Sequence, residues 1–163
     1  MKNVIIIVAI LAASVLQAQD MKKLESMVGQ WKGTAIMTDQ NGRNEIHQTE
    51  DVKWGLDGKI LIINGKGFKG EGGEKVFEAY GIIHWDPATS KYVFNAYTHE
   101  GRYTQAEAYF EGEDFIWTFE IPNNGGRIKY SLKLNDNSWV EDGQFSRDGE
   151  TWYPFFHMEL TRG

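Results

Sequence analysis

Residues 114–135 read DFIWTFEIPNNGGRIKYSLKLN, and this stretch decides the fold. In its first part, Phe115, Trp117 and Phe119 alternate with other residues, and in its second part Tyr130 and Leu132 alternate with polar ones. A period of two is typical of a β-strand with one buried face. The Pro-Asn-Asn-Gly-Gly between the two parts predicts a hairpin turn. The stretch therefore predicts two antiparallel strands with a common apolar, aromatic inner face.

The rest of the chain repeats this pattern. Short apolar or alternating runs are separated by Asn-Gly, Asp-Gly and Asp-Pro turns, without a long helical pattern between them. One run before Gly29, with Leu24, Met27 and Val28 on one face, predicts a short N-terminal helix. Hairpin spacing over about ten strands predicts an all-β fold, an antiparallel up-and-down β-barrel, with a sandwich as the alternative. The predicted strands are 31–37, 45–54, 59–68, 75–85, 91–98, 103–111, 114–121, 127–135, 138–145 and 151–161.

Residues 1–18 have the layout of a secretory signal peptide. Lys2 gives a positive start, residues 4–16 form an uncharged apolar run, and Ala18 offers a small residue for cleavage. A membrane-spanning helix needs about 20 apolar residues, so an uncleaved anchor is the less favoured alternative. We therefore expect export to the periplasm or the medium without stable membrane anchoring, and a single barrel domain over residues 21–163.

The composition narrows the classes of partner. The chain has no cysteine, so disulfide bonds do not stabilise it. Its formal net charge is −6, and Lys and Arg are scattered along the sequence. A chain of this kind is a poor match to nucleic-acid phosphates and to anionic membrane surfaces. We expect neither as a partner, and the pattern does not predict an oligomeric state.

Gly29-Gln30-Trp31 opens the first predicted strand, and Arg162 stands near the end of the last one. This arrangement resembles the Gly-x-Trp signature of the calycin superfamily, which includes lipocalins and fatty-acid-binding proteins. The resemblance implies that Trp31 closes one end of the barrel and that Arg162 packs over its ring.

A narrower resemblance covers nearly the whole chain after the predicted signal peptide. The chain is similar to a bacterial lipocalin-like family of unknown function whose members often carry a signal peptide. The matching landmarks include Trp85-Asp86-Pro87 and Asp148-Gly149 followed by Trp152. His84 departs from that family, in which glycine is more frequent. The resemblance implies the fold and brings no activity with it.

Polar residues fall on the expected inner face of two strands. Gln48 and Glu50 alternate in phase with Val52, and Asn64 in phase with Ile62. Polar groups on an apolar face indicate a wet or ligand-holding cavity, and the alternative is that they meet water at the barrel mouth. We expect a small, largely apolar ligand. The candidate lining is Gln48, Glu50, Ile62, Asn64, Phe94, Trp117, Phe119, Tyr130, Trp139 and Phe156.

No pattern in the sequence predicts catalysis, a metal site or a cofactor. Residues 65–70 match G-x-G-x-x-G, but no helix follows that could bind a dinucleotide, so we interpret them as a hairpin loop. His47, His84, His99 and His157 are far apart and lack metal-ligand spacing. We therefore expect a binding protein, not an enzyme.

Two alternatives stay open. An aromatic content of 13% is enough to fill a narrow barrel, which would make the protein a structural or interaction module without a ligand. Nitrobindins, which resemble this barrel, hold haem through a histidine on a late strand, and this resemblance implies His157 as the candidate. If Met158 and Leu160 point inward, however, His157 points outward.

Overall fold

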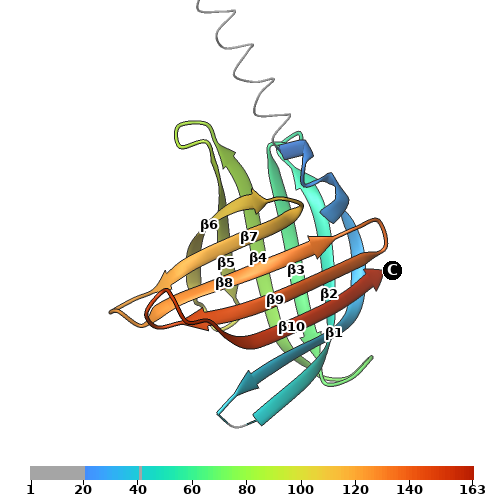
Figure 1. Cartoon of the computed structure of the whole chain (residues 1–163). Helices are drawn as coiled ribbons and strands as arrows, with labels where there is room; N and C mark the ends of the chain where they lie inside the picture. Colours follow the sequence, from blue (N-terminus) through green and yellow to red (C-terminus); the bar gives the residue numbers. More distant parts are fainter. Residues whose placement is uncertain (1–20, 41) are drawn as a thin grey trace, which may run out of the picture.

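The computed structural model describes residues 21–40 and 42–163, so the predicted signal peptide lies outside the described residues. The described strands form one closed antiparallel barrel in which each strand pairs with its neighbours in sequence and β1 pairs with β10 (Figure 1). The prediction of an up-and-down barrel is confirmed. The strands are β1 (Gly29–Asp39), β2 (Gly42–Gly55), β3 (Ile60–Phe68), β4 (Lys75–Asp86), β5 (Lys91–Thr98), β6 (Tyr103–Glu111), β7 (Asp114–Ile121), β8 (Gly126–Leu134), β9 (Ser138–Ser146) and β10 (Tyr153–Arg162).

The hairpin that decides the fold joins β7 and β8 through the predicted turn. Trp117 is paired with Tyr130, and Asn123 and Asn124 have positive φ values of 60° and 56° in the turn. Asparagine tolerates this left-handed conformation better than most residues, which explains its place there. The interpretation of residues 65–70 as a hairpin loop is wrong for residues 65–68, which belong to β3.

The segment before β1 closes one end of the barrel. The short helix expected there is one 3-10 turn, η1 (Glu25–Met27). The chain enters β1 at Gly29, and the backbone hydrogen bonds before it join residues three apart, such as Met27 N to Leu24 O. Leu24 and Met27 are buried in the core. Trp31 Nε1 donates to Met27 O at 2.8 Å, so the closing segment and the first strand are linked.

Arg162 holds this closed end in the manner that the calycin resemblance implied. Its guanidinium lies 4.2 Å from the centre of the Trp31 ring and donates to Val28 O at 2.7 Å and to Ser26 O at 3.0 Å. Gly29 has φ +138°, and a Cβ there would lie 2.4 Å from Arg162 Nη1. Glycine is therefore required where the chain passes under the guanidinium.

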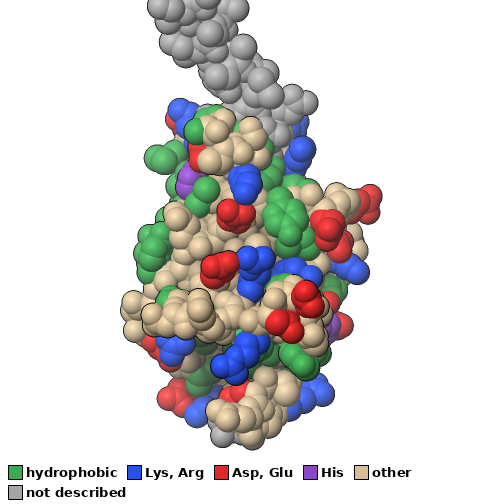
Figure 2. Space-filling view, turned by 60° about the vertical axis from the view of Figure 1, so that its left-hand side comes forward, with side chains coloured by type: hydrophobic (Ala, Val, Ile, Leu, Met, Phe, Trp, Pro, Cys, Tyr) green, Lys and Arg blue, Asp and Glu red, His purple; other side chains and the backbone are tan. Residues whose placement is uncertain are grey.

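The other end of the barrel is the mouth, where the β1–β2 hairpin projects beyond the other strands (Figure 1). On the face shown in Figure 2, acidic and basic side chains are interspersed with apolar ones and do not form separate patches. Within residues 21–40 and 42–163, no helix has the length and apolar character needed to cross a membrane.

Candidate functional site

The inward side chains include a fully buried group at the base and a partly exposed group nearer the mouth. At the base, near η1, Trp31, Leu61 and Ile83 are at most 1% exposed. Nearer the mouth, the inward rings of Phe94 and Trp117 keep part of their surface exposed. These rings lie on the inner face, which in a closed barrel meets solvent at the mouth. We call this part of the barrel interior the lumen.

Aromatic rings form one wall of the lumen. Trp117 stacks on Tyr130, with ring centres 3.9 Å apart and planes inclined by 8°, and Phe94 meets Trp117 edge-on at 4.9 Å. Phe156 meets the Tyr130 ring at 5.6 Å. A Cβ at Gly143 would lie 2.8 Å from Tyr130 Cε1, so glycine lets this ring lie flat against β9. The wall is aromatic, and the rings of Phe94 and Trp117 in it are partly exposed.

Glu141, on β9, is a buried carboxyl group joined to this wall. It is 7% exposed and accepts N–H bonds from Trp117 Nε1 at 2.8 Å and Trp139 Nε1 at 3.2 Å. Burial raises the pKa of Glu141, and the two indole donors oppose that rise. Burial also raises the pKa of Tyr130, and the charge of Glu141 adds to this effect. Each carboxyl oxygen of Glu141 thus accepts a hydrogen bond from one indole.

Glu50, on β2, is a second buried carboxyl group, and one of its oxygens has no partner. Gln48 Nε2 donates to Glu50 Oε1 at 2.8 Å, whereas Oε2 is buried without a hydrogen bond within the described part of the chain. Burial raises the pKa of Glu50 from 4.5 to about 8; the Gln48 bond opposes the rise and nearby Glu141 adds to it. An unsatisfied buried polar group is unfavourable by about 1–3 kcal/mol. Its presence marks Glu50 as a candidate functional group.

Small residues follow Glu50 along its inward row, whereas Trp31 precedes it. In register, Glu50 pairs with Gly65, Gly65 with Ala79, and Ala79 with Thr98, so the four lie in one inward row from β2 to β5. A Cβ at Gly65 would lie 2.8 Å from both Glu50 carboxyl oxygens, so glycine lets the carboxyl group extend over β3. Thr98 Oγ1, at the other end of the row, is also buried without a described partner. Two unsatisfied oxygens thus flank a floor of Gly65 and Ala79.

Most of the predicted lining residues lie on the inner face. Gln48 and Glu50 are buried there, and the inward Phe119 ring lies 5.9 Å from that of Trp117. Trp139 belongs to the base, where it meets Trp31 edge-on with ring centres 5.7 Å apart. Phe94, Trp117, Tyr130 and Phe156 form the wall described above.

The predicted inward orientation of Ile62 and Asn64 is wrong. Leu61 and Ile63 are 0% and 8% exposed, and the two glycines that follow continue their face. Because side chains alternate along a strand, Ile62 and Asn64 point outward, where Asn64 hydrogen-bonds to Glu78. The glycines carry no side chain to mark the inner face, so the sequence allowed β3 to be assigned one residue out of phase.

His157 lies on the outer face. Its neighbours Met158 and Leu160 are buried, while its ring Nδ1 lies 2.7 Å from Asp142 Oδ1 and its Nε2 lies 3.0 Å from Glu159 Oε1. These two bonds raise the pKa of His157. The ring points away from the lumen, so its position does not fit a haem ligand there.

In the part of the chain that the structure describes, no group of three or more His, Cys, Asp or Glu side chains is placed to hold a metal ion.

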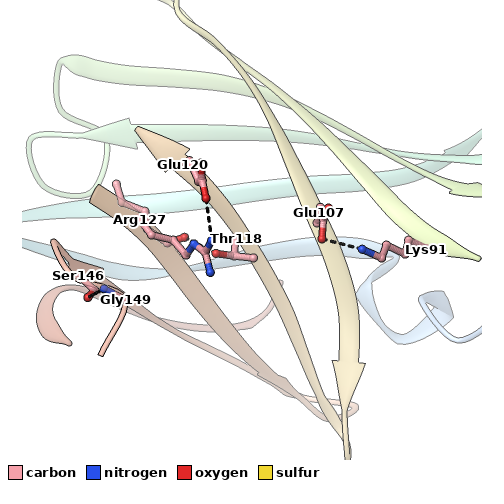
Figure 3. Close-up of polar contacts among 8 residues, drawn as sticks. Lys91, Glu107, Thr118, Glu120, Arg127, Ser146 and Gly149 are labelled. Atoms are coloured by element: carbon pink, nitrogen blue, oxygen red, sulfur yellow. Dashed lines mark hydrogen bonds and ion pairs between the residues drawn. The ribbon is translucent and has the colours of Figure 1, made fainter. Parts of the chain in front are cut away.

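Charged residues on the outer face are paired across neighbouring strands. Lys91 Nζ lies 2.9 Å from Glu107 Oε2, and Arg127 Nη2 lies 2.7 Å from Glu120 Oε1 (Figure 3). Such exposed pairs contribute about 0–1 kcal/mol each. The acids of the inner face differ, since no buried side chain among the described residues is basic.

Two hollows lie outside the lumen. One of about 380 Å³ is next to η1, and its lining includes the inward residues Phe115 and Leu132 of the base. The other, of about 240 Å³, lies on β1, β9 and β10 near Lys32 and Glu159. Neither is lined by Glu50 or Glu141.

Sequence reasoning missed Glu141 and Thr98. Glu141 alternates in phase with Trp139 and Gly143 on β9, so the same argument that selected Glu50 was available for it. Thr98 gave no such signal, because its place in the row depends on the pairing of four strands.

Comparison with known proteins supports the fold alone. No protein-family description matches the sequence, and no curated protein matches it. The crystal structure of Rv2717c from M. tuberculosis is similar, with a TM-score of 0.64 over 88% of this chain and 96% of that chain, at 9% sequence identity. At this identity the likeness is evidence for a shared barrel architecture, and membership of the calycin superfamily stays a prediction.

Proposed function

We propose that this protein is an exported binding protein that holds a small, largely apolar molecule in the lumen. The observation that carries the proposal is the partial exposure of the inward rings of Phe94 and Trp117. Ligand sites are typically apolar hollows with a few fixed polar groups. The aromatic wall and the Gln48–Glu50 and Glu141 groups supply these two features.

The position of Ala96 offers a direct test. Ala96 lies on the inner face of β5 and is partly exposed, whereas Gln105 lies on the outer face of the adjacent β6. We expect the neutral dye N-phenyl-1-naphthylamine to bind the purified protein with enhanced, saturable emission. Ala96→Trp should abolish this binding because the new ring occupies the lumen, and Gln105→Trp should leave it intact.

The same variants distinguish a lumen from a barrel filled by its own rings. A lumen with space accepts Ala96→Trp with little change in the free energy of unfolding, whereas a filled barrel is destabilised by about 1–3 kcal/mol. Absence of dye binding to the unmodified protein, together with strong destabilisation by Ala96→Trp, would refute the proposal in favour of a structural module.

Export is tested separately. The intact mass of the protein recovered from a periplasmic fraction should correspond to loss of residues 1–18. Recovery of the full-length chain from the cytoplasmic fraction alone would contradict export.

A further inference from the structure

The charge of the inner face favours one class of ligand. The buried polar or charged side chains among the described residues are Gln48, Glu50, Glu141 and Ser146, and none of them is basic. Two buried acids without a basic partner are unfavourable unless something compensates them. The whole chain also carries a net charge of −6, which attracts cations and repels anions.

The unsatisfied atoms define the positions of two polar contacts. Glu50 Oε2 extends over Gly65, and Thr98 is two strands farther along the same inward row. Neighbouring strands are about 4.8 Å apart, so Gly65 and Thr98 are separated by about 10 Å. Within the inward row itself, Ala79 is the residue between them, and its side chain is a methyl group. A flat molecule with a polar group at each end matches this spacing.

We propose that the ligand is a small aromatic amine whose ammonium group binds to Glu50, with its second polar group at Thr98. This inference rests on the proposed lumen function. The ammonium group supplies the hydrogen bond that Glu50 Oε2 lacks. The aromatic wall of Phe94, Trp117 and Tyr130 belongs to the same interior and offers apolar contact to the ring of the amine. Glu141 is a second acid in the same interior, and a carboxylate or phosphate ligand would lie beside two acids with no basic side chain buried among the described residues.

Binding of the amine is coupled to loss of a proton. Burial keeps the free Glu50 carboxyl group protonated near neutral pH, because its pKa is raised to about 8. The ammonium group favours the carboxylate, so the Glu50 proton passes to solvent while the ammonium keeps its own. The other titratable groups of this interior cluster are Glu141 on β9 and Tyr130 on β8, both with raised pKa values. Affinity should therefore rise between pH 6 and pH 8.

The test uses three probes of nearly equal shape. Tyramine carries an ammonium group and a phenol, 4-(2-hydroxyethyl)phenol replaces the ammonium group by a neutral hydroxyl, and 4-hydroxyphenylacetate replaces it by an anion. Calorimetric titration of the purified protein should show tyramine binding at least about tenfold more tightly than either analogue, as expected for a buried charge-assisted contact. Titrations in buffers of different ionisation enthalpy should detect the released proton.

Variants assign the two contacts. Glu50→Gln keeps the shape and the Gln48 bond, and it should weaken tyramine binding at least about tenfold and abolish proton release. Glu111→Gln, at an exposed outer position of β6, is the matched control and should change neither. Thr98→Val should weaken binding of tyramine but not that of 2-phenylethylamine, which lacks the phenol hydroxyl.

Two results would overturn the inference. If the neutral analogue binds as tightly as tyramine, or Glu50→Gln binds tyramine normally, the ligand is not recognised as a cation. Provided that the naphthylamine dye still binds and is excluded by Ala96→Trp, the lumen function survives that result. If the dye also fails to bind, the proposed function fails with it.

Discussion

Replacing Glu50 by glutamine should make the protein more stable at neutral and alkaline pH. The pKa of this carboxyl group is raised from 4.5 to about 8, chiefly by burial, so the folded state holds a proton that the unfolded chain releases above pH 4.5. The contribution of Glu50 to the free energy of unfolding is therefore largest at low pH, and it falls as the pH rises towards 8. Each pH unit in that window removes about 1.4 kcal/mol, which gives about 3 kcal/mol by pH 7 and an upper limit of about 5 kcal/mol above pH 8.

Glutamine has no proton to lose, so Glu50→Gln should lack this part of the pH dependence. Melting curves followed by tryptophan fluorescence at pH 5, 7 and 9 should nearly coincide for the two proteins at pH 5. At pH 9 they should differ by roughly 10 °C, since about 2–4 °C corresponds to 1 kcal/mol in a chain of this size. Glu111→Gln is the control, because that side chain is exposed. Parallel curves for Glu50→Gln and the unmodified protein from pH 5 to pH 9 would refute the burial of a neutral carboxyl group.

Three further substitutions probe the closed end, the floor and the outer face. Arg162→Ala should reduce the free energy of unfolding by about 2 kcal/mol in urea titrations, because it removes the bonds to Val28 O and Ser26 O; Arg162→Lys should restore only part of the loss. Gly65→Ala should displace the Glu50 carboxyl group, weakening tyramine binding and destabilising the fold by about 1–3 kcal/mol, and unchanged affinity would contradict the close approach. His157→Ala should leave dye and tyramine titrations unchanged, whereas loss of either would place this residue in the binding site.

The sequence predicted the fold because its strands carry their signals locally. The alternation around Trp117 and Tyr130 and the turn between them do not depend on distant residues, and every strand is paired with the next one along the chain. The closed end was also predictable, because a resemblance tied Trp31 to Arg162. The extent of the N-terminal helix was not, since it depends on how the chain must turn into β1.

The site was predicted only in part, because it depends on phase and on register. Gln48 and Glu50 lie on a strand with large apolar neighbours of clear phase, so their inward orientation was correct. The inward positions in the second half of β3 are glycines, and Asn64 was consequently assigned to the wrong face. The grouping of Glu50 with Thr98 arises from three successive strand pairings, which no local pattern specifies.

The two buried acids have different surroundings, and this difference separates a structural role from a binding role. Glu141 is held by two indoles, one packed on Trp31 in the base and the other stacked on Tyr130 in the wall, so it ties the two parts of the barrel together. At pH 5, Glu141→Gln should therefore destabilise the protein by about 1–3 kcal/mol in urea titrations, because the amide N–H₂ would face an indole N–H and leave donors unsatisfied. At higher pH the loss of a buried acid opposes this effect, since burial raises the pKa of Glu141 as well. Glu50 has one satisfied oxygen and one free, and its replacement should stabilise the fold while removing amine recognition. The comparison is made at pH 5, where Glu50→Gln should change stability little. If Glu141→Gln were equally neutral there, the two indole bonds would not give Glu141 a structural role and the proposed difference between the two carboxyl groups would be refuted.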